Sequence, residues 1–311
     1  MAEPVSAPLT TRFGCLDALR GSALCGMVAY HTDWDLAALG WPVTNPAGSP
    51  AWTAFGNLVA AIFLAVSGAA LVLARSKGSA AALRRLVVVG LAGAAVTAFS
   101  LWFAPDEPIL FGILQCLAVS NSVVLAILHW PAFMRLGIAA MVILLPALWR
   151  SVAFDGWPLA TFGLGTRSPP TLDFRPLLPW IGAVLVGTVV GEALLRSPAR
   201  SGRGSLSLVG LRWLGRNSLA VYLLHQPFLY GALILIGLAV GAPERDADPF
   251  TLQCRSDCSA TGAAARLCKA ACACTAERLA GEAASASARG SGLTSGHLDA
   301  LGAACRKAGG G

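Results

Sequence analysis

The stretch FLAVSGAALVLA, residues 63–74, contains no charged side chain and completes an apolar run that begins at residue 52. A helix rises about 1.5 Å per residue, so about 20 apolar residues cross the hydrocarbon core of a membrane, and this run is long enough. The whole chain of 311 residues is 56% hydrophobic and only 13% charged, whereas roughly a quarter of the residues in a soluble domain are charged. We therefore expect an integral membrane protein.

Six other runs meet the same length criterion, and together they predict an all-α, polytopic membrane helix bundle of about seven transmembrane helices. Small residues are dense in several runs, as in VSGAALVLA (66–74) and GLAGAA (90–95), which suits close helix packing in lipid. We expect this transmembrane domain to cover residues 1–242. The seven expected spans are residues 16–39, 52–74, 84–104, 109–129, 132–149, 177–196 and 217–240.

The Lys and Arg residues of the short loops predict the orientation of the chain, because cytoplasmic loops carry an excess of basic residues. With the N-terminus on the cytoplasmic side, eleven basic residues fall on that side and three on the other. Seven crossings then place the C-terminus outside. The basic residues lie between apolar runs without interleaved aromatic residues, so the net charge of +7 does not indicate nucleic-acid binding. The first ten residues lack a basic region ahead of an apolar core, so we expect the first span to serve as its own insertion signal.

The composition changes after residue 242, because the tail, residues 243–311, is polar and holds six of the nine cysteines. Cysteines on the outer side favour disulfides, which persist in oxidising compartments. Two pairs of these cysteines are each four residues apart, so each pair shares one face of a short helix. Two such helices folded back on each other would bridge Cys254–Cys272 and Cys258–Cys268 and leave Cys274 for Cys305, although six cysteines allow 15 pairings. A zinc site is the alternative, but the C-x₂-C spacing typical of zinc sites is absent, so we favour disulfides and expect no metal.

Span one contains MVAYHTDWDL (27–36), in which ionisable side chains interrupt an apolar run. Ionisable side chains are costly within a bilayer and mark a functional site by default. His31 and Asp35 are four residues apart and share one helix face, where the carboxylate can fix the imidazole tautomer and raise its basicity. Asp33 points elsewhere and is a candidate contact for an acceptor. A histidine that only hydrogen-bonds a neighbouring helix is the alternative, and the Asp35 partner favours function over it.

A second histidine occurs inside span seven, in YLLHQPF (222–228). At about 1.5 Å per residue, His31 lies about 20 Å and His225 about 13 Å along their spans from the cytoplasmic side. Both depths fall in the middle of the bilayer or slightly outside it, so the two side chains could face a shared cavity. Gln226 adds a further polar group beside His225.

Other polar residues stand near the ends of the spans. Arg20 lies at the inner mouth of span one, and Arg216 enters span seven from the cytoplasmic side in WLGRNSLAVYLLHQP (213–227). Gln115 lies one turn inside span four in FGILQCLAVS (111–120). Asp173 and Arg175 lie at the outer interface in TLDFRPLLPWIG (171–182). A helix cap is the simpler role for Asn217 or Ser218.

Five motifs, taken in their order along the chain, resemble those of bacterial membrane proteins related to heparan-α-glucosaminide N-acetyltransferase. The resemblance covers residues 12 to about 240, and the cysteine-rich tail is similar to the tail of many alphaproteobacterial members. It implies a bacterial inner membrane protein with a cytoplasmic N-terminus and a periplasmic C-terminus. The motifs are LDALRGSALCGMVAYHTDWDL (16–36), FLAVSGAALVLA (63–74), FGILQCLAV (111–119), DFRPLLPWIGAVLVG (173–187) and LGRNSLAVYLLHQPFL (214–229).

The resemblance implies acyl transfer across a membrane, from cytoplasmic acetyl-CoA or another acyl-CoA to an amino sugar or other glycan acceptor outside. Bacterial members usually have histidines where this chain has Gln115 and Asn217, and the loop that holds the catalytic histidine of the lysosomal enzyme has none here (40–51). His31 is therefore a replacement candidate for that base.

We expect His31 to act as the base with Asp35 as its orienter, and His225 as a second proton-handling or acyl-positioning group. Direct transfer and an acyl-histidine intermediate both agree with these residues. We assign Arg20, Arg216 and Gln115 to the acyl-CoA, since the planar fork of arginine suits phosphate. The residues assigned to the acceptor are Asp33, Asp173, Arg175 and Gln226.

Two other classes of function agree with parts of the sequence. A proton-coupled transporter would use buried His and Asp residues as a relay, although the seven spans show no repeat of halves. A non-catalytic anchor would present the tail to a periplasmic partner, and a homo-oligomer is a further possible assembly. The lipid bilayer is the partner common to all three interpretations.

Overall fold

The structure is a computed structural model that describes residues 13–39, 41, 43, 49–196, 207–240, 254, 258, 267–268, 270–276 and 278–279. The chain divides into two compact units. The first unit comprises Met1–Thr32 and Pro46–Leu229, and the second comprises Asp33–Asn45 and Tyr230–Gly311. The predicted domain boundary at residues 242 and 243 lies outside the described residues and stays a prediction.

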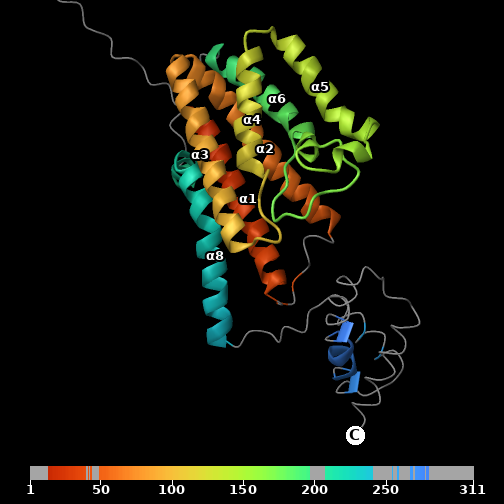
Figure 1. Ribbon diagram of the computed structural model, residues 1–311. Coiled ribbons are helices and arrows are strands. Elements are labelled where there is room, and N and C mark those ends of the chain that lie inside the picture. The colour runs from red at the N-terminus through yellow and green to blue at the C-terminus, as the bar shows by residue number, and fades with distance from the viewer. Residues whose placement is uncertain are drawn as a thin grey trace, which may run out of the picture. The chain divides into compact units, whose positions relative to one another are not determined.

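Helices correspond to all seven predicted spans, and the described residues contain no strand, so the all-α membrane bundle is confirmed (Figure 1). Four of these helices, α2, α3, α6 and α8, are long and apolar enough to cross a membrane, and α4 and α5 are shorter apolar helices. Helix α1 is as long as α3 but carries charged side chains at both ends. The seven helices are α1 (Gly14–Ala38), α2 (Pro50–Arg75), α3 (Ser79–Phe103), α4 (Ile113–Ile127), α5 (Ala132–Leu148), α6 (Leu177–Arg196) and α8 (Ser218–Val240).

Helices α2 and α6 approach each other so closely that their backbones touch. A Cβ atom on Gly68 would overlap the carbonyl oxygen of Val184, and one on Gly187 would overlap that of Ala65. Gly187 and Gly191 form a G-x-x-x-G pattern, which allows close helix approach in membranes. The main core cluster therefore forms around this helix pair, with Leu64, Leu71, Val184 and Leu185 among its fully buried members.

The structure contains a helix that the seven predicted spans omit, α7 (Ser207–Arg216). It packs directly on α1, because a Cβ atom on Gly21 would overlap the carbonyl oxygen of Leu211, and one on Gly215 would overlap that of Asp17. With ten residues α7 is too short to span a membrane, so a search for spans could not find it.

Helix α4 is shorter than the predicted span 109–129, because the residues before it bond to other elements. The hydroxyl of Thr97 donates to the Ile109 carbonyl (2.8 Å), and the amide of Ile109 donates to the Ser100 hydroxyl (2.9 Å). The segment between α5 and α6 contains two short 3₁₀ helices, η2 (Val152–Phe154) and η3 (Leu159–Phe162). Asp155 fixes this segment by accepting hydrogen bonds from Thr166 and from the Arg167 amide.

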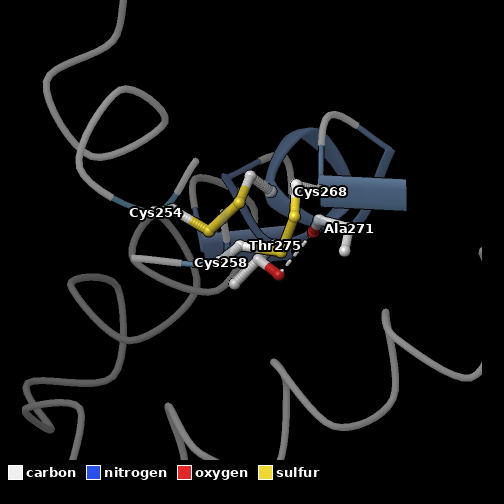
Figure 2. Close-up of a disulfide and its surroundings, with 6 residues drawn as sticks. Cys254, Cys258, Cys268, Ala271 and Thr275 are labelled. Carbon is white, nitrogen blue, oxygen red and sulfur yellow. Dashed lines mark hydrogen bonds between the residues drawn. A yellow bond between two sulfur atoms is a disulfide. The ribbon is translucent and has the colours of Figure 1, made fainter. Parts of the chain in front are cut away.

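Two disulfides in the second unit have the predicted connectivity, Cys254–Cys272 and Cys258–Cys268 (Figure 2). Both sulfurs of each pair are taken up in a disulfide, so the zinc alternative does not apply to these four cysteines. Cys274 is also disulfide-bonded. Its predicted partner Cys305 lies outside the described residues, and that pairing stays a prediction.

Candidate active site

The two predicted histidines lie side by side in the first unit. The ring centroids of His31, from α1, and His225, from α8, are 5.1 Å apart, and the ring planes are tilted by 58°. The rings of Tyr30 and His31 form a T-shaped pair with centroids 5.9 Å apart, and the Tyr222 ring lies 5.7 Å from that of His225. The histidines are 194 positions apart in the chain, so only the packing of α1 and α8 brings them together.

One hydrogen bond fixes the tautomer of His225. Its Nδ1 atom lies 2.6 Å from the carbonyl oxygen of Tyr222. A carbonyl oxygen only accepts, so Nδ1 carries the proton and Nε2 of the neutral ring keeps a lone pair. The Nε2 atom is buried, and no described residue donates a hydrogen bond to it. His225 therefore has the protonation pattern of a base, oriented by its own helix.

Arg175 lies within electrostatic range of His31 and is held by contacts on several sides. Its guanidinium donates to the side-chain oxygen of Asn57 in α2 (3.0 Å) and lies 5.3 Å from the ring centroid of Trp180. Its Nε atom is 3.8 Å from a carboxylate oxygen of Asp173. The cation is thus fixed near the histidine pair, where it can attract an electron-rich substrate group.

Asp173 has a structural contact that the sequence did not indicate. Its carboxylate accepts a hydrogen bond from the Ile113 amide (2.9 Å), which satisfies a free N–H group at the start of α4. Burial raises the pKa of the Asp173 carboxyl, while Arg175 and the Ile113 amide act in the opposite direction. Asp173 therefore caps α4, and the predicted contact with the acyl acceptor would be a second role of the same carboxylate.

The polar atoms of Gln115 are taken up by other parts of the bundle. Its amide nitrogen donates to the Gly93 carbonyl (2.9 Å) and the Thr97 hydroxyl (2.7 Å), and its oxygen accepts from the Gly112 amide (3.0 Å). Gln115 is not among the described residues that line the arginine-containing cavity of the first unit. These contacts tie α3 to α4.

The remaining predicted site residues are close in sequence to His225 or to His31. Gln226 follows His225 in α8 and is half-buried. Asp33 and Asp35 belong to the second unit, although they continue helix α1 beyond His31. Asp35 is 3% exposed, and Asp33 is half-buried. The orienting role of Asp35 stays a prediction.

A cavity of about 580 Å³ opens in the first unit among α1, α2, α3, α4, α7 and α8. Its volume is within the range of small-molecule sites, roughly 300–1,000 Å³. Arg20 and Arg216, which were predicted to bind acyl-CoA, both line it. Arg84 and Arg85, which were counted only among the basic residues of the cytoplasmic side, line it as well. The lining residues are Arg20, Phe63, Ser67, Ala74, Ala81, Arg84, Arg85, Val88, Val89, Ile113, Leu114, Leu117, Arg216, Ser218, Leu219 and Tyr222.

Four arginines give this cavity a strong positive charge. No Asp or Glu is among the described residues that line it. Asp17, which lies beside it, pairs with Arg216 at 3.4 Å and is within electrostatic range of Arg20. One carboxylate against four guanidinium groups leaves an excess of positive charge, which suits a ligand with several phosphate groups.

The cavity and the histidine pair share a segment of α8. Tyr222 lines the cavity, and its carbonyl oxygen accepts the hydrogen bond that orients His225. A ligand in the cavity that extends past Tyr222 would therefore approach the histidines. The two features form one candidate active site.

Arg135 has a different environment from the four cavity arginines. Arg135 is 1% exposed and forms an ion pair with Glu192. It also donates to the Thr188 hydroxyl (2.7 Å) and the Trp130 carbonyl (3.1 Å). These contacts clamp α5 to α6, so the role of Arg135 is structural.

Comparison with known proteins supports a membrane acetyltransferase role. Residues 12–227 match the family described as heparan-alpha-glucosaminide N-acetyltransferase, catalytic. No curated protein and no solved structure matches the chain. The matched region includes the arginine-lined cavity and both histidines and covers more than half of the sequence. The chain therefore belongs to the heparan-alpha-glucosaminide N-acetyltransferase catalytic-domain family.

Proposed function

We propose that this protein transfers an acetyl or other acyl group from acyl-CoA to an amino sugar or related glycan acceptor across the membrane. The family uses acetyl-CoA as its donor in general. The observation that carries the proposal is the junction at Tyr222, where an arginine-lined cavity meets two adjacent histidines. This arrangement suits a donor with phosphates at one end and a thioester at the other.

In the proposed reaction the acceptor nitrogen or oxygen attacks the thioester carbonyl carbon. The new C–N or C–O bond forms, and the C–S bond breaks. The proton of the acceptor passes to a histidine nitrogen and then to the departing CoA thiolate, so that the products are the acylated acceptor and CoA. We assign this proton transfer to His31 as base and to the Nε2 lone pair of His225 as a second proton acceptor.

The donor and the acceptor are proposed to approach from opposite faces. Arg84, Arg85 and Arg216 belong to regions that the distribution of basic residues predicts to be cytoplasmic, so acyl-CoA would enter there. Arg175 and Asp173 precede α6 on the predicted outer side, where the acceptor would arrive. A bacterial inner membrane with a cytoplasmic N-terminus follows from the same reasoning.

Sealed vesicles test both the reaction and its direction. We would reconstitute the full chain, supply acetyl-labelled CoA outside and trap glucosamine inside, select the cytoplasm-out orientation by protease protection, and measure labelled N-acetylglucosamine in the lumen. His31→Ala and His225→Ala are expected to lower the rate by about 10²–10⁴-fold, the usual contribution of general acid–base catalysis.

His129→Ala is the matched control, because His129 lies just beyond the end of α4 beside Trp130, away from the histidine pair. It is expected to leave the rate unchanged. Equal rates for wild type and His31→Ala would contradict the role of that base. Solute flux without acyl-CoA would favour a transporter instead.

A further inference from the structure

Ser67 lies at the centre of a polar network where the cavity meets the interior of the bundle. It is 5% exposed and is the only serine from α2 among the described residues that line the cavity. Its hydroxyl oxygen lies 2.9 Å from the side-chain nitrogen of Asn121 and 3.4 Å from a guanidinium nitrogen of Arg85. These two neighbours determine which further hydrogen bond the Ser67 hydroxyl can form.

Both neighbours of Ser67 are hydrogen-bond donors. Arg85 has no acceptor atom. The side-chain nitrogen of Asn121 also lies 2.7 Å from the carbonyl oxygen of Leu117. A carbonyl only accepts, so the amide group of Asn121 must present its nitrogen to Leu117, and the same nitrogen donates to Ser67. The Ser67 oxygen therefore accepts two hydrogen bonds.

A serine hydroxyl has two lone pairs and one proton. Asn121 and Arg85 occupy the lone pairs, which leaves the proton as the one group through which Ser67 can bind a further partner. Because Ser67 lines the cavity, a ligand atom that binds its hydroxyl there has to be a hydrogen-bond acceptor. The network thus makes Ser67 a donor and excludes it as an acceptor.

The depth of Ser67 indicates which part of the ligand it meets. Helices α1 and α2 run antiparallel, with Gly56 packed on Tyr30 and Val66 clustered with Leu16. Ser67 is therefore at the level of the first turns of α1 and well below His31. It lies among the guanidinium groups and away from the histidine pair.

We propose that the Ser67 hydroxyl donates a hydrogen bond to a phosphate oxygen of the CoA bound in the cavity, with Asn121 as the positioning residue that makes the serine a donor. The part of the cavity around Ser67 then offers hydrogen-bond donors, since Ser67 adds a neutral O–H to the neighbouring guanidinium group of Arg85. It selects for a phosphate group, which accepts hydrogen bonds at every oxygen. This inference rests on the proposed function and adds a residue that a search for charged groups would not find.

Binding to the full chain in lipid nanodiscs, measured by calorimetry, tests the proposal with three probes. Acetyl-CoA and CoA both carry the phosphates, whereas acetyl-pantetheine carries the thioester without them. Ser67→Ala is expected to raise the Kd of acetyl-CoA and CoA equally, by about tenfold, as for a hydrogen bond to a charged group. The Kd of acetyl-pantetheine should stay unchanged.

Ser120→Ala is the matched control, because Ser120 is buried in α4 beside Cys116 and does not line the cavity. It should bind all three probes as the wild type does. If Ser67→Ala does not fold, Ser67→Cys is measured in its place. Cysteine is similar in size to serine, and its thiol is only a weak hydrogen-bond donor. The same loss is expected.

A double-mutant cycle separates a direct contact from an effect on Arg85. Ser67→Ala should weaken CoA binding further in an Arg85→Gln background. No further loss would mean that the hydroxyl acts only through Arg85 and would overturn the proposal. A folded Ser67→Ala variant that binds CoA like the wild type would also overturn the proposal. So would a variant that binds acetyl-CoA and acetyl-pantetheine more weakly but binds CoA as before. If the wild type binds neither CoA species, the proposed function itself fails.

Discussion

The bundle holds arginines in two contrasting environments. Arg135 is buried and has an ion-pair partner, Glu192, and two further hydrogen-bond acceptors. Arg20, Arg84, Arg85 and Arg216 line a cavity whose described lining residues include no carboxylate. A charge inside a membrane protein is costly unless it is paired. The partners of an arginine, more than its depth, therefore separate a structural charge from one available for a ligand. Among the four cavity arginines, only Arg216 has a described carboxylate within 4 Å, that of Asp17 at 3.4 Å.

The largest effect on stability is expected from breaking the paired arginine. Arg135→Gln leaves Glu192 as a carboxylate with only the exposed Arg196 nearby, 3.8 Å away. Removing one partner of a buried ion pair destabilises a protein by about 3–5 kcal/mol. Equilibrium unfolding in detergent measures this loss. The double variant Arg135→Met with Glu192→Leu should recover most of the stability, and a double variant as unstable as the single one would contradict the interpretation of a paired structural charge.

Removing a cavity arginine should have the opposite pattern, with a loss of function and little loss of stability. Arg85→Gln is expected to raise KM for acetyl-CoA by about tenfold or more, since it removes a charged donor to phosphate. The unfolding midpoint should stay near that of the wild type.

Arg75→Gln is the matched control for Arg85→Gln, because Arg75 is exposed at the end of α2 and does not line the cavity. Steady-state kinetics in nanodiscs would show an unchanged KM for this control. If Arg85→Gln instead unfolds the protein and leaves KM unchanged, the contrast between the two classes of arginine does not hold.

The close contact between α2, which lines the cavity, and α6, which carries Glu192, offers a test with a smaller expected effect. Gly187→Ala places a methyl group against the backbone of Ala65 and is expected to cost about 1–3 kcal/mol, as for overpacking of a core. Gly137→Ala, in α5, meets no atom within 4 Å and should leave stability unchanged or slightly increased. Unfolding free energies of the two variants give the comparison. Equal unfolding free energies for the two variants would show that the stability of the α2–α6 packing does not depend on the close approach of the two backbones.

The smallest effect is expected outside the bundle, at Asp155. The hydrogen bond from Thr166 holds the pKa of this exposed carboxyl below its usual value. A lowered pKa in the folded state means that the contact stabilises the segment above the unfolded pKa and is lost as pH falls through the folded pKa. The protection of residues 151–167 against hydrogen exchange, relative to the intrinsic exchange rate at each pH, should therefore fall in acid, and Asp155→Asn should remove most of that pH dependence. A variant with the same pH profile as the wild type would exclude Asp155 as the cause.

Much of the fold follows from the sequence, because the length of an apolar run sets whether it can span a membrane. Helix α6 has the bounds that were predicted, and the disulfide pairing follows from cysteines four residues apart. Helix α7 was missed because a short amphipathic helix carries no length signal. Its contact with α1 through Gly21 and Gly215 depends on tertiary packing alone.

The candidate site was predictable only in part. The depth of each histidine in its span indicated that His31 and His225 could meet, and their rings are 5.1 Å apart. Arg84 and Arg85 fell at the expected start of span three and were counted only among the basic residues of the cytoplasmic side. Helix α3 in fact begins at Ser79, so both arginines lie on a helix that faces the cavity. The contacts of Gln115 and Asp173 with distant backbone groups could not be found from spacing within one segment.

Photo-crosslinking tests most directly whether the arginine-lined cavity delivers the acyl donor to the histidine pair. A CoA thioester with a photoreactive group on its acyl end would be bound to the full chain, irradiated, and mapped by mass spectrometry. We expect labelling of α1 near His31 and of α8 between Tyr222 and His225, with loss of label when free CoA competes or when Arg85→Gln is used. Labelling that CoA does not compete, or that falls only on segments away from these two helices, would contradict the proposed path of the donor.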